Sequence, residues 1–383
     1  MPANHSAALA SPRRSPRPLP PRLTPWRRAK RIAVIAFVLC AVPTTISFVT
    51  TMTSPSNSSF TIRSFEWLRD HGAAAIASSI EGFYYTLTAP STGGSPLKAL
   101  PLKVRVPVVP AVHPPNVAPV ITPSLPGEGV WSPAESWTAA GLPVLITQFR
   151  SDPHYPQMVA GVAWINMQTA RIAWIPGRQE PSVSLPRGSM EVPVDSRARL
   201  LATFNSAFKL SDSGGGGIAL AGQTYAPLRP GLATFVGYSD GRVDIQSWAG
   251  GSVAPSNVIF ARQNLPLIVA AGRPNPNLSD GPEWGATLGN AVRVWRSGVG
   301  VDARGNLIYA AANDQTVGSL AAILIRAGAV RAMELDINSY WVTFNSYGQQ
   351  FAGNPSRLLP GMIRSAARYL SPDDRDFFAV YAK

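Results

Sequence analysis

Short apolar runs separated by turn residues dominate the chain from about residue 127 onward. They are rich in Val, Ile and Trp and have the lengths of strands. The expected strands lie at 142–149, 159–165, 170–175, 267–270, 298–301 and 307–312. A hairpin is expected over 232–248, because Asp240-Gly241 supplies a tight turn between two further runs.

Helical spacing is found in only a few places. Apolar positions between 317 and 325 fall on one face of a helix that Thr316 would cap and Gly328 would end. A final helix is expected near 362–370, and one or two short helices over 60–87. Many strands with few helices predict the α+β class, with a mixed β-sheet domain and a few packing helices.

The N-terminal region predicts a membrane attachment. Residues 32–52 carry no charge and match the length of about 20 residues that spans a bilayer. Arginines before this span and none directly after it predict a cytoplasmic N-terminus and an extracytoplasmic C-terminal domain. A cleaved signal peptide is the competing interpretation, because Ser, Thr and Pro follow the span. The long basic leader and the lack of a convincing small-x-small cleavage site favour a transmembrane signal anchor.

The rest of the organisation follows from composition. We expect a basic cytoplasmic leader at 1–31, the anchor at 32–52 and a juxtamembrane stalk at 53–88. Residues 89–126 are crowded with Pro, Ser and Gly and predict an extended linker. The remaining residues, 127–383, form the expected functional domain.

Charge and cysteine content exclude several classes of protein. The leader holds eight Lys and Arg and no acidic residue, more than half of the formal net charge of +13. Because this charge precedes a membrane span, we expect a membrane rather than a nucleic-acid partner. The single cysteine, Cys40, lies inside the span, so residues 127–383 can form no disulfide and no cysteine-based site.

Familiar hydrolytic motifs are not found in their usual context. The G-x-S-x-G match at Gly237-Tyr-Ser-Asp-Gly241 falls in the expected hairpin turn rather than between a strand and a helix, and there is no H-E-x-x-H and no Walker A motif. The four histidines (His5, His71, His113 and His154) lie in no motif-rich stretch. Any chemistry must therefore come from carboxylates, amides, hydroxyls and arginines, and neither a Ser-His-Asp triad nor a histidine-ligated metal site is predicted.

The stretch 331–344 is the strongest candidate for such chemistry. It reads as a buried strand in which Glu334, Asp336 and, if the strand continues, Asn338 share one face. Two buried carboxylates need cations or hydrogen-bond donors. They are either a functional pair or partners of Arg331 or another arginine in structural ion pairs.

Three further stretches contain candidate binding residues. Arg296 precedes a Gly-containing strand and can reach a phosphate or form a structural salt bridge. Asn205 lies among aromatic residues and can orient a sugar hydroxyl or hold a loop. The weakest signal is Arg262-Gln263-Asn264.

These stretches, in this order, resemble the phosphodiester glycosidase family, which includes N-acetylglucosamine-1-phosphodiester α-N-acetylglucosaminidases. Asn205-Ser-Ala-Phe208 resembles the family's Asn-Gly-Gly/Asp-Phe-Phe stretch. Arg296-Ser-Gly-Val-Gly300 resembles Arg-[Ser/Thr]-Ala-[Ile/Val]-Gly, and a helix ending at Gly328 follows. The stretch from Ala332 to Tyr340 resembles Ala-Leu-Asn-Leu-Asp-Gly-Gly-Gly-Ser-Ser. The resemblance covers about residues 140–350 and suggests a divergent bacterial member.

The resemblance implies a hydrolase of a sugar-1-phosphodiester or related envelope glycan, and the span at 32–52 would anchor it to the membrane. Arg296 would neutralise the phosphate, and Asp336 and Glu334 would supply acid, base or nucleophile. Substrate contacts are expected from Asn205, Phe208, Lys209, Arg262, Asn264, Ser297, Asn338 and Ser339. No ligand spacing demands a cofactor, although a divalent cation near the two carboxylates stays open.

Two departures from the family pattern support an alternative function. Glu334 stands where the family has Asn, and Ile337-Asn338-Ser339 replaces its glycine run. Glycines there would let the backbone approach a substrate closely. The alternative is a non-catalytic glycan-binding or exopolysaccharide-assembly protein that uses the same fold.

Overall fold

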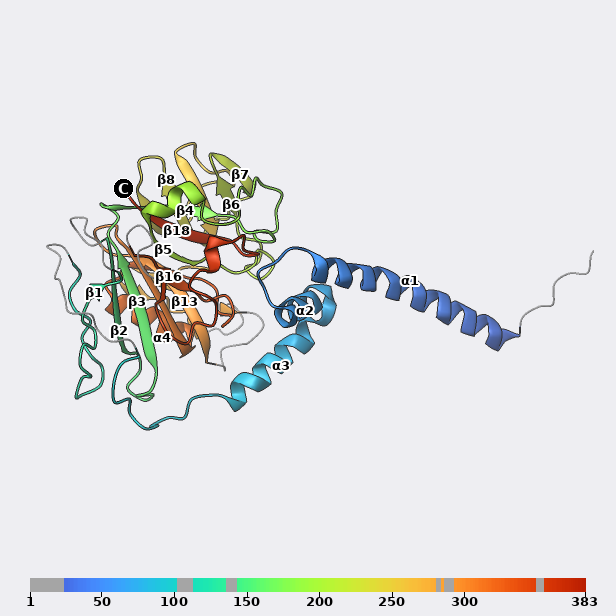
Figure 1. Cartoon of the computed structure of the whole chain (residues 1–383), viewed down its shortest axis with the longest axis horizontal. Helices are drawn as coiled ribbons and strands as arrows, with labels where there is room; N and C mark the ends of the chain where they lie inside the picture. The colour runs from blue at the N-terminus through green and yellow to red at the C-terminus, as the bar shows by residue number, and fades with distance from the viewer. Residues whose placement is uncertain (1–23, 102–112, 136–142, 280–283, 286–292, 349–354) are drawn as a thin grey trace, which may run out of the picture. The chain divides into compact units, whose positions relative to one another are not determined.

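The computed structural model describes residues 24–101, 113–135, 143–279, 284–285, 293–348 and 355–383 (Figure 1). The chain divides into two compact units, Met1–Ser54 and Pro55–Lys383. The expected leader lies mostly outside the described residues, as do parts of the expected linker.

The first unit contains one long helix, α1 (Pro25–Thr53), of 29 residues. At 1.5 Å per residue it extends about 44 Å, which exceeds the hydrocarbon thickness of a bilayer. Within the described ranges it is the one helix long and apolar enough to cross a membrane, a test that a signal sequence also passes. Such a helix fits the expected anchor, and its direction of insertion stays a prediction.

The second unit is built on three antiparallel sheets, and the expected α+β class is confirmed. The largest sheet has the order β1 (Ser132–Pro133), β2 (Val144–Arg150), β3 (Val159–Ile165), β14 (Leu307–Gln315), β13 (Val294–Val301), β15 (Arg331–Glu334), β11 (Val269–Ala270), β12 (Arg273–Pro274). The second has the order β7 (Gln223–Ala226), β6 (Ile218–Leu220), β10 (Val258–Gln263), β8 (Ala233–Tyr238), β9 (Val243–Ser247). The third has the order β17 (Ser356–Arg357), β16 (Phe344–Ser346), β5 (Leu200–Asn205), β18 (Phe377–Ala382), β4 (Ala170–Ile175).

Both faces of the largest sheet are buried, which explains its continuous apolar runs. On β14, Ile308 and Ala310 belong to one core cluster together with Leu320 of helix α4 (Val317–Arg326). The alternate residues of β14 face a second cluster, which includes Phe204 and Phe378 of the third sheet. Figure 1 shows β13 of the large sheet beside β5 and β16. The period-2 alternation thus separates two apolar environments rather than core from solvent.

Helix α4 begins and ends where the sequence predicts. The Thr316 hydroxyl accepts a hydrogen bond from the Ser319 backbone N–H at 3.1 Å, and the Ser319 hydroxyl accepts one from the Thr316 N–H at 2.9 Å. Gly328 has a φ of 101°, a conformation that glycine adopts without strain. The predicted hairpin is also confirmed, with Ala233–Tyr238 paired to Val243–Ser247.

Residues 60–87 form a helical hairpin, here called the α2–α3 hairpin. It consists of α2 (Phe60–Leu68), a kinked turn (Arg69–Ala73) and α3 (Ala74–Leu87). Gly72 makes the turn with a φ of 89°. This segment was expected as a juxtamembrane stalk. In the structure the preceding residues are bonded to the segment before β18: Ser58 donates to Asp374 at 2.9 Å and Asn57 to Asp373 at 2.8 Å.

Two local expectations were wrong. The strand at 331–344 ends at Glu334 rather than continuing to Asn338. The final helix near 362–370 is not formed, and only one 3-10 turn, Arg368–Leu370, is present there. Arg368 instead turns inward to bond Asp373 through two nitrogens, at 2.8 and 2.9 Å, and this buried ion pair holds the chain out of a regular helix.

Candidate functional site

After β15 ends, the chain stays hydrogen-bonded to β13 for two more residues. This continued pairing brings the candidate residues of the two segments together. Beyond Glu334, Leu335 donates to the Ser297 carbonyl at 2.8 Å. Ser297 in turn donates its backbone N–H and its hydroxyl to the Asp336 carbonyl, at 3.2 and 2.7 Å. The backbone at Asp336 is therefore held by the large sheet although it is no longer part of a strand.

Glu334 and Arg296 form an ion pair inside the core. The distance between Arg296 Nη1 and Glu334 Oε1 is 2.5 Å, and the two residues are 1% and 2% exposed. Arg296 Nε also donates to the Gln315 carbonyl at 3.0 Å. Burial raises the pKa of Glu334 to about 7, against the lowering effect of Arg296. For both residues, a structural salt bridge was the alternative to a functional role, and the observed pair has the geometry of such a salt bridge.

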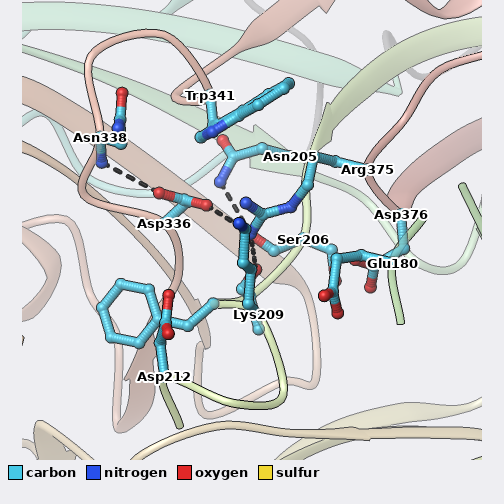
Figure 2. Close-up of polar contacts among 12 residues, drawn as sticks. Glu180, Asn205, Ser206, Lys209, Asp212, Asp336, Asn338, Trp341, Arg375 and Asp376 are labelled. Atoms are coloured by element: carbon cyan, nitrogen blue, oxygen red, sulfur yellow. Dashed lines mark hydrogen bonds and ion pairs between the residues drawn. The ribbon is translucent and has the colours of Figure 1, made fainter. Parts of the chain in front are cut away.

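Asp336 lies in a different environment from Glu334. Its Oδ2 accepts from Arg375 Nη2 at 2.7 Å, and its Oδ1 accepts from the Asn338 backbone N–H at 2.9 Å. Burial raises the pKa of Asp336, although Arg375 opposes this. Figure 2 shows the carboxylate pointing toward the Arg375 guanidinium, with the Lys209 side chain reaching the same place.

Lys209 is the second cation of this group. Its Nζ contacts Glu66 of α2 and lies 3.2 Å from Asp70 Oδ1. Burial raises the pKa of Glu66, but Lys209 outweighs that effect and the net shift is downward. For Lys209, burial lowers the pKa, whereas Glu66 raises it above its ordinary value. The two side chains are thus held in their charged forms.

A cavity of 190 Å³ lies where these side chains meet. Its lining combines the loop after β15, the segment after β5, the C-terminal region and the α2–α3 hairpin. The lining residues are Glu66, Arg69, Glu81, Tyr85, Phe208, Lys209, Ser211, Asp212, Gly285, Asp336, Ile337, Asn338, Trp341 and Arg375. The lining combines four carboxylates, three cations and three aromatic side chains, a composition that can bind a polar ligand and move protons.

Several predicted residues support this site from outside the cavity lining. Asn205 is 3% exposed, and its Oδ1 accepts from the Tyr309 hydroxyl at 2.9 Å and from the Thr343 N–H at 3.0 Å. Its Nδ2 donates to Ser297 Oγ at 3.0 Å. Asn205 therefore holds the Ser297 hydroxyl that in turn holds Asp336, a positioning role rather than contact with a ligand.

Arg262 and Asn264 lie in the core as well. Arg262 is fully buried, donates from Nε to Asp376 Oδ2 at 2.9 Å and from Nη2 to the Phe208 carbonyl at 2.5 Å. Asn264 donates to the Glu334 carbonyl at 2.7 Å. Neither residue lines the cavity, but the bond from Arg262 to the Phe208 carbonyl fixes the segment that carries Phe208 and Lys209.

The remaining predicted residues lie at the cavity or at its edge. Phe208, Lys209 and Asn338 line it. Ser339 hydrogen-bonds the side chain of Tyr85, whose pKa is raised by burial. The predicted set thus divides into residues that reach the cavity and residues that build its walls.

Sequence reasoning missed Arg375, Asp212, Trp341 and the whole contribution of the α2–α3 hairpin. One signal was present: Asp373-Asp374-Arg375-Asp376 places four charges directly before a fully apolar strand. Buried charges in such company need partners, and Arg375 finds Asp336. Trp341 lies against the same guanidinium, 5.2 Å from its centre.

No group of three or more His, Cys, Asp or Glu side chains in the described part of the chain is arranged to hold a metal ion. Asp336 and Glu334 are each neutralised by an arginine rather than facing a common point. The chemistry of these donors gives no support to a cation between them.

No protein-family model matches the chain, and no curated protein matches it either. Among solved structures it is similar to the zebrafish N-acetylglucosamine-1-phosphodiester α-N-acetylglucosaminidase catalytic domain auto-inhibited by its pro-peptide. The identity is 14% over 66% of this chain and 87% of that chain, with a TM-score of 0.43. A hypothetical protein from Synechocystis is 15% identical over 63% of this chain and 62% of its own, with a TM-score of 0.36. Similarity at this level assigns neither a family nor an activity.

Proposed function

We propose that the second unit is an extracytoplasmic hydrolase, related to the phosphodiester glycosidases, that acts on a sugar-1-phosphodiester or a related envelope glycan. The observation that carries the proposal is the cavity in which Asp336 meets Lys209 and Arg375. A phosphodiester needs cations, and hydrolysis at an anomeric carbon needs a carboxyl group within the same pocket.

In this proposal Lys209 and Arg375, rather than Arg296, receive the phosphate. All three cations are paired with carboxylates, but Arg296 is buried beside Glu334 and does not line the cavity. Lys209 and Arg375 both line it and come from different parts of the chain. Two cations on one anionic group stabilise the charge that grows on the departing phosphate.

The carboxyl chemistry then falls to Asp336 with Asp212 rather than to Asp336 with Glu334. Asp212 lines the same cavity, and its charge contributes to the raised pKa of Asp336. One carboxylate takes a proton from a water molecule while the oxygen of that water bonds to the anomeric carbon. The bond from that carbon to the phosphate oxygen breaks, and the phosphate leaves with the electron pair. Asn338 and Ser339 would orient sugar hydroxyls.

One observation favours the alternative, a non-catalytic glycan-binding protein. Both carboxylate oxygens of Asp336 are already engaged, one by Arg375 and one by the Asn338 N–H. A carboxylate so held orients a ligand well but must exchange a partner before it accepts a proton from water.

A paired assay separates the two functions. Residues 55–383, wild type and Asp336→Asn, are incubated with a panel of sugar-1-phosphodiesters, and free sugar is measured beside ligand binding. Release by the wild type alone supports the hydrolase. Binding without release in both proteins supports the glycan-binding protein. Asp244→Asn, at a half-exposed ion pair with Arg331, is the control that keeps the cavity intact.

Membrane anchoring through α1, with a cytoplasmic N-terminus, is part of the same proposal. Its support is the basic leader followed by an apolar helix of 29 residues. Protease treatment of intact cells tests it: the second unit is expected to be digested from outside, and a released, shortened protein would indicate a cleaved signal peptide instead.

A further inference from the structure

Helix α3 carries Glu81 and Tyr85 inward and its large aliphatic side chains outward. Glu81 and Tyr85, four residues apart, line the cavity, and Ala77 of the same face is buried. The opposite face, here called the outer face of α3, consists of Ile76, Ile80, Phe83, Tyr84 and Leu87, whose exposed fractions range from 58 to 70%. Their spacing is that of one side of a helix. No charged residue interrupts this face.

Such a face calls for an apolar partner, because soluble proteins rarely gather large apolar side chains in one exposed patch. A shallow apolar depression lined by Ile76, Ile80 and Phe83 lies on it. In Figure 1, α3 lies at the periphery of the second unit and runs into the segment that follows it. The helix contacts the unit through the face that carries Ala77, Glu81 and Tyr85, which leaves the outer face exposed.

The size of the face argues against a second copy of the chain as the partner. The five side chains, each roughly 150–200 Å² when fully exposed, are 58 to 70% exposed and so offer roughly 500–600 Å² of accessible surface. Stable protein–protein interfaces bury about 800 Å² on each partner. A bilayer has no such requirement, since it accepts a few apolar side chains at a time.

The position of the hairpin in the chain favours a bilayer. Only residues 54–59 separate α1, the candidate membrane span, from α2. The outer face also combines aliphatic residues with Phe83 and Tyr84, and aromatic side chains are enriched at the membrane interface. Its lack of charge indicates insertion among lipids rather than attraction to anionic headgroups.

We propose that the outer face of α3 is a bilayer-binding surface, distinct from the span α1, and that it lies in the interfacial region of the membrane. The opposite face of the same helix lines the cavity, so membrane binding acts on an element of the site itself. The proposal does not depend on whether the cavity binds or hydrolyses its ligand.

Site-specific fluorescence tests the proposal with residues 55–383, which include all five hydrophobic core clusters. This fragment lacks Cys40 and is therefore free of cysteine. Ile80→Cys, labelled with an environment-sensitive dye, is mixed with phosphatidylcholine vesicles. Val253→Cys, at a position 70% exposed and outside the hairpin, is the matched control. A blue shift at position 80 and none at position 253 is expected.

Flotation with the same vesicles gives a second readout. We expect the wild-type fragment to float with the vesicles. In the triple variant Ile76→Gln, Ile80→Gln, Phe83→Gln the vesicle-bound fraction should be at least tenfold smaller than in the wild type. Val194→Gln with Val253→Gln should float as the wild type does. No flotation of the wild type, or equal flotation of the triple variant, would overturn the proposal. The wild type could instead fail to float and form a dimer without lipid that the triple variant does not form. That result would also overturn the proposal and would assign the face to a second copy of the chain.

Discussion

Glu334 and Asp336 lie two residues apart on one extended stretch, yet each is neutralised by a different arginine. Glu334 meets Arg296 in the core at 2.5 Å, whereas Asp336 meets Arg375 at the cavity at 2.7 Å. The stretch leaves the strand between them, so their side chains no longer share one face. This divergence assigns Glu334 to the stability of the sheet and Asp336 to the site.

The first prediction concerns the pH dependence of stability. The pKa of Glu334 is raised from 4.5 to about 7, so the folded protein keeps a proton that the unfolded chain has lost within this window. The contribution of Glu334 to the free energy of unfolding is therefore full below pH 4.5 and is lost as the pH rises to about 7. At about 1.4 kcal/mol per pH unit, its upper bound is about 3 kcal/mol.

The variant Glu334→Gln should remove this part of the pH dependence. Urea unfolding at a series of pH values measures it as the difference between wild type and variant. Glu191→Gln, at a partly exposed ion pair with Arg197, is the control and should leave the slope unchanged. An identical slope in wild type and Glu334→Gln would contradict the prediction.

The second prediction separates the roles of Arg296 and Lys209. Arg296→Lys should lower the free energy of unfolding by about 2 kcal/mol, because lysine cannot reach both Glu334 and the Gln315 carbonyl. It should leave the affinity for inorganic phosphate unchanged. Lys209→Met should instead reduce that affinity at least tenfold, because it removes a cation from the cavity.

Calorimetric titration with phosphate, combined with thermal unfolding of each variant, measures both effects. If Arg296→Lys weakened phosphate binding while Lys209→Met did not, the phosphate would belong near Arg296, as the family resemblance implies.

The third prediction concerns Glu66, whose carboxylate is already paired with Lys209, one of the cations that line the cavity. Glu66 contacts Lys209, and its pKa is lowered by that contact despite burial. An incoming anion must compete with it. Glu66→Gln should therefore raise the affinity for inorganic phosphate by about tenfold, which corresponds to about 1.4 kcal/mol.

The control for this variant is Glu191→Gln, which neutralises a carboxylate away from the cavity. Unchanged phosphate affinity together with lost sugar release would show that Glu66 takes part in the reaction rather than competing with the ligand.

The fourth prediction concerns Asp373, which connects the C-terminal region to the segment before α2. It accepts from Arg368 through two bonds and from Asn57 at 2.8 Å, and it is fully buried. Asp373→Asn should lower the free energy of unfolding by about 3 kcal/mol, because it leaves Arg368 buried without its counter-charge.

This contribution should also disappear in acid. Burial raises the pKa of Asp373, but Arg368 outweighs it and the net shift is below 3.8. The stabilisation is therefore present above pH 3.8 and is lost as the pH falls through the lowered pKa. Denaturation with urea at neutral and acid pH measures it. Asp240→Asn, at an exposed ion pair with Arg242, should leave stability unchanged at both pH values.

Local signals were sufficient for those elements whose limits are encoded within a few residues. Thr316 and Gly328 delimit α4, and Asp240-Gly241 turns the hairpin, because capping and turn preferences act over one turn of chain. The helix predicted at 362–370 was wrong because the structure there depends on a more distant partner. There, the pairing of Arg368 with Asp373 outweighed helical spacing, and spacing alone does not reveal ion-pair partners.

The sequence by itself determined the α+β class and the apolar N-terminal helix, and it placed Asp336, Lys209 and Phe208, which line the cavity, among the candidate residues. Only the tertiary structure decided which carboxylate reaches the cavity and which cation accompanies it. Arg375 lies 39 residues from Asp336, and Glu66 lies before the Pro-rich segment. Burial and charge pairing depend on such distant neighbours. The pKa values and ion pairs of this site are therefore set only when the sheets and the α2–α3 hairpin pack together.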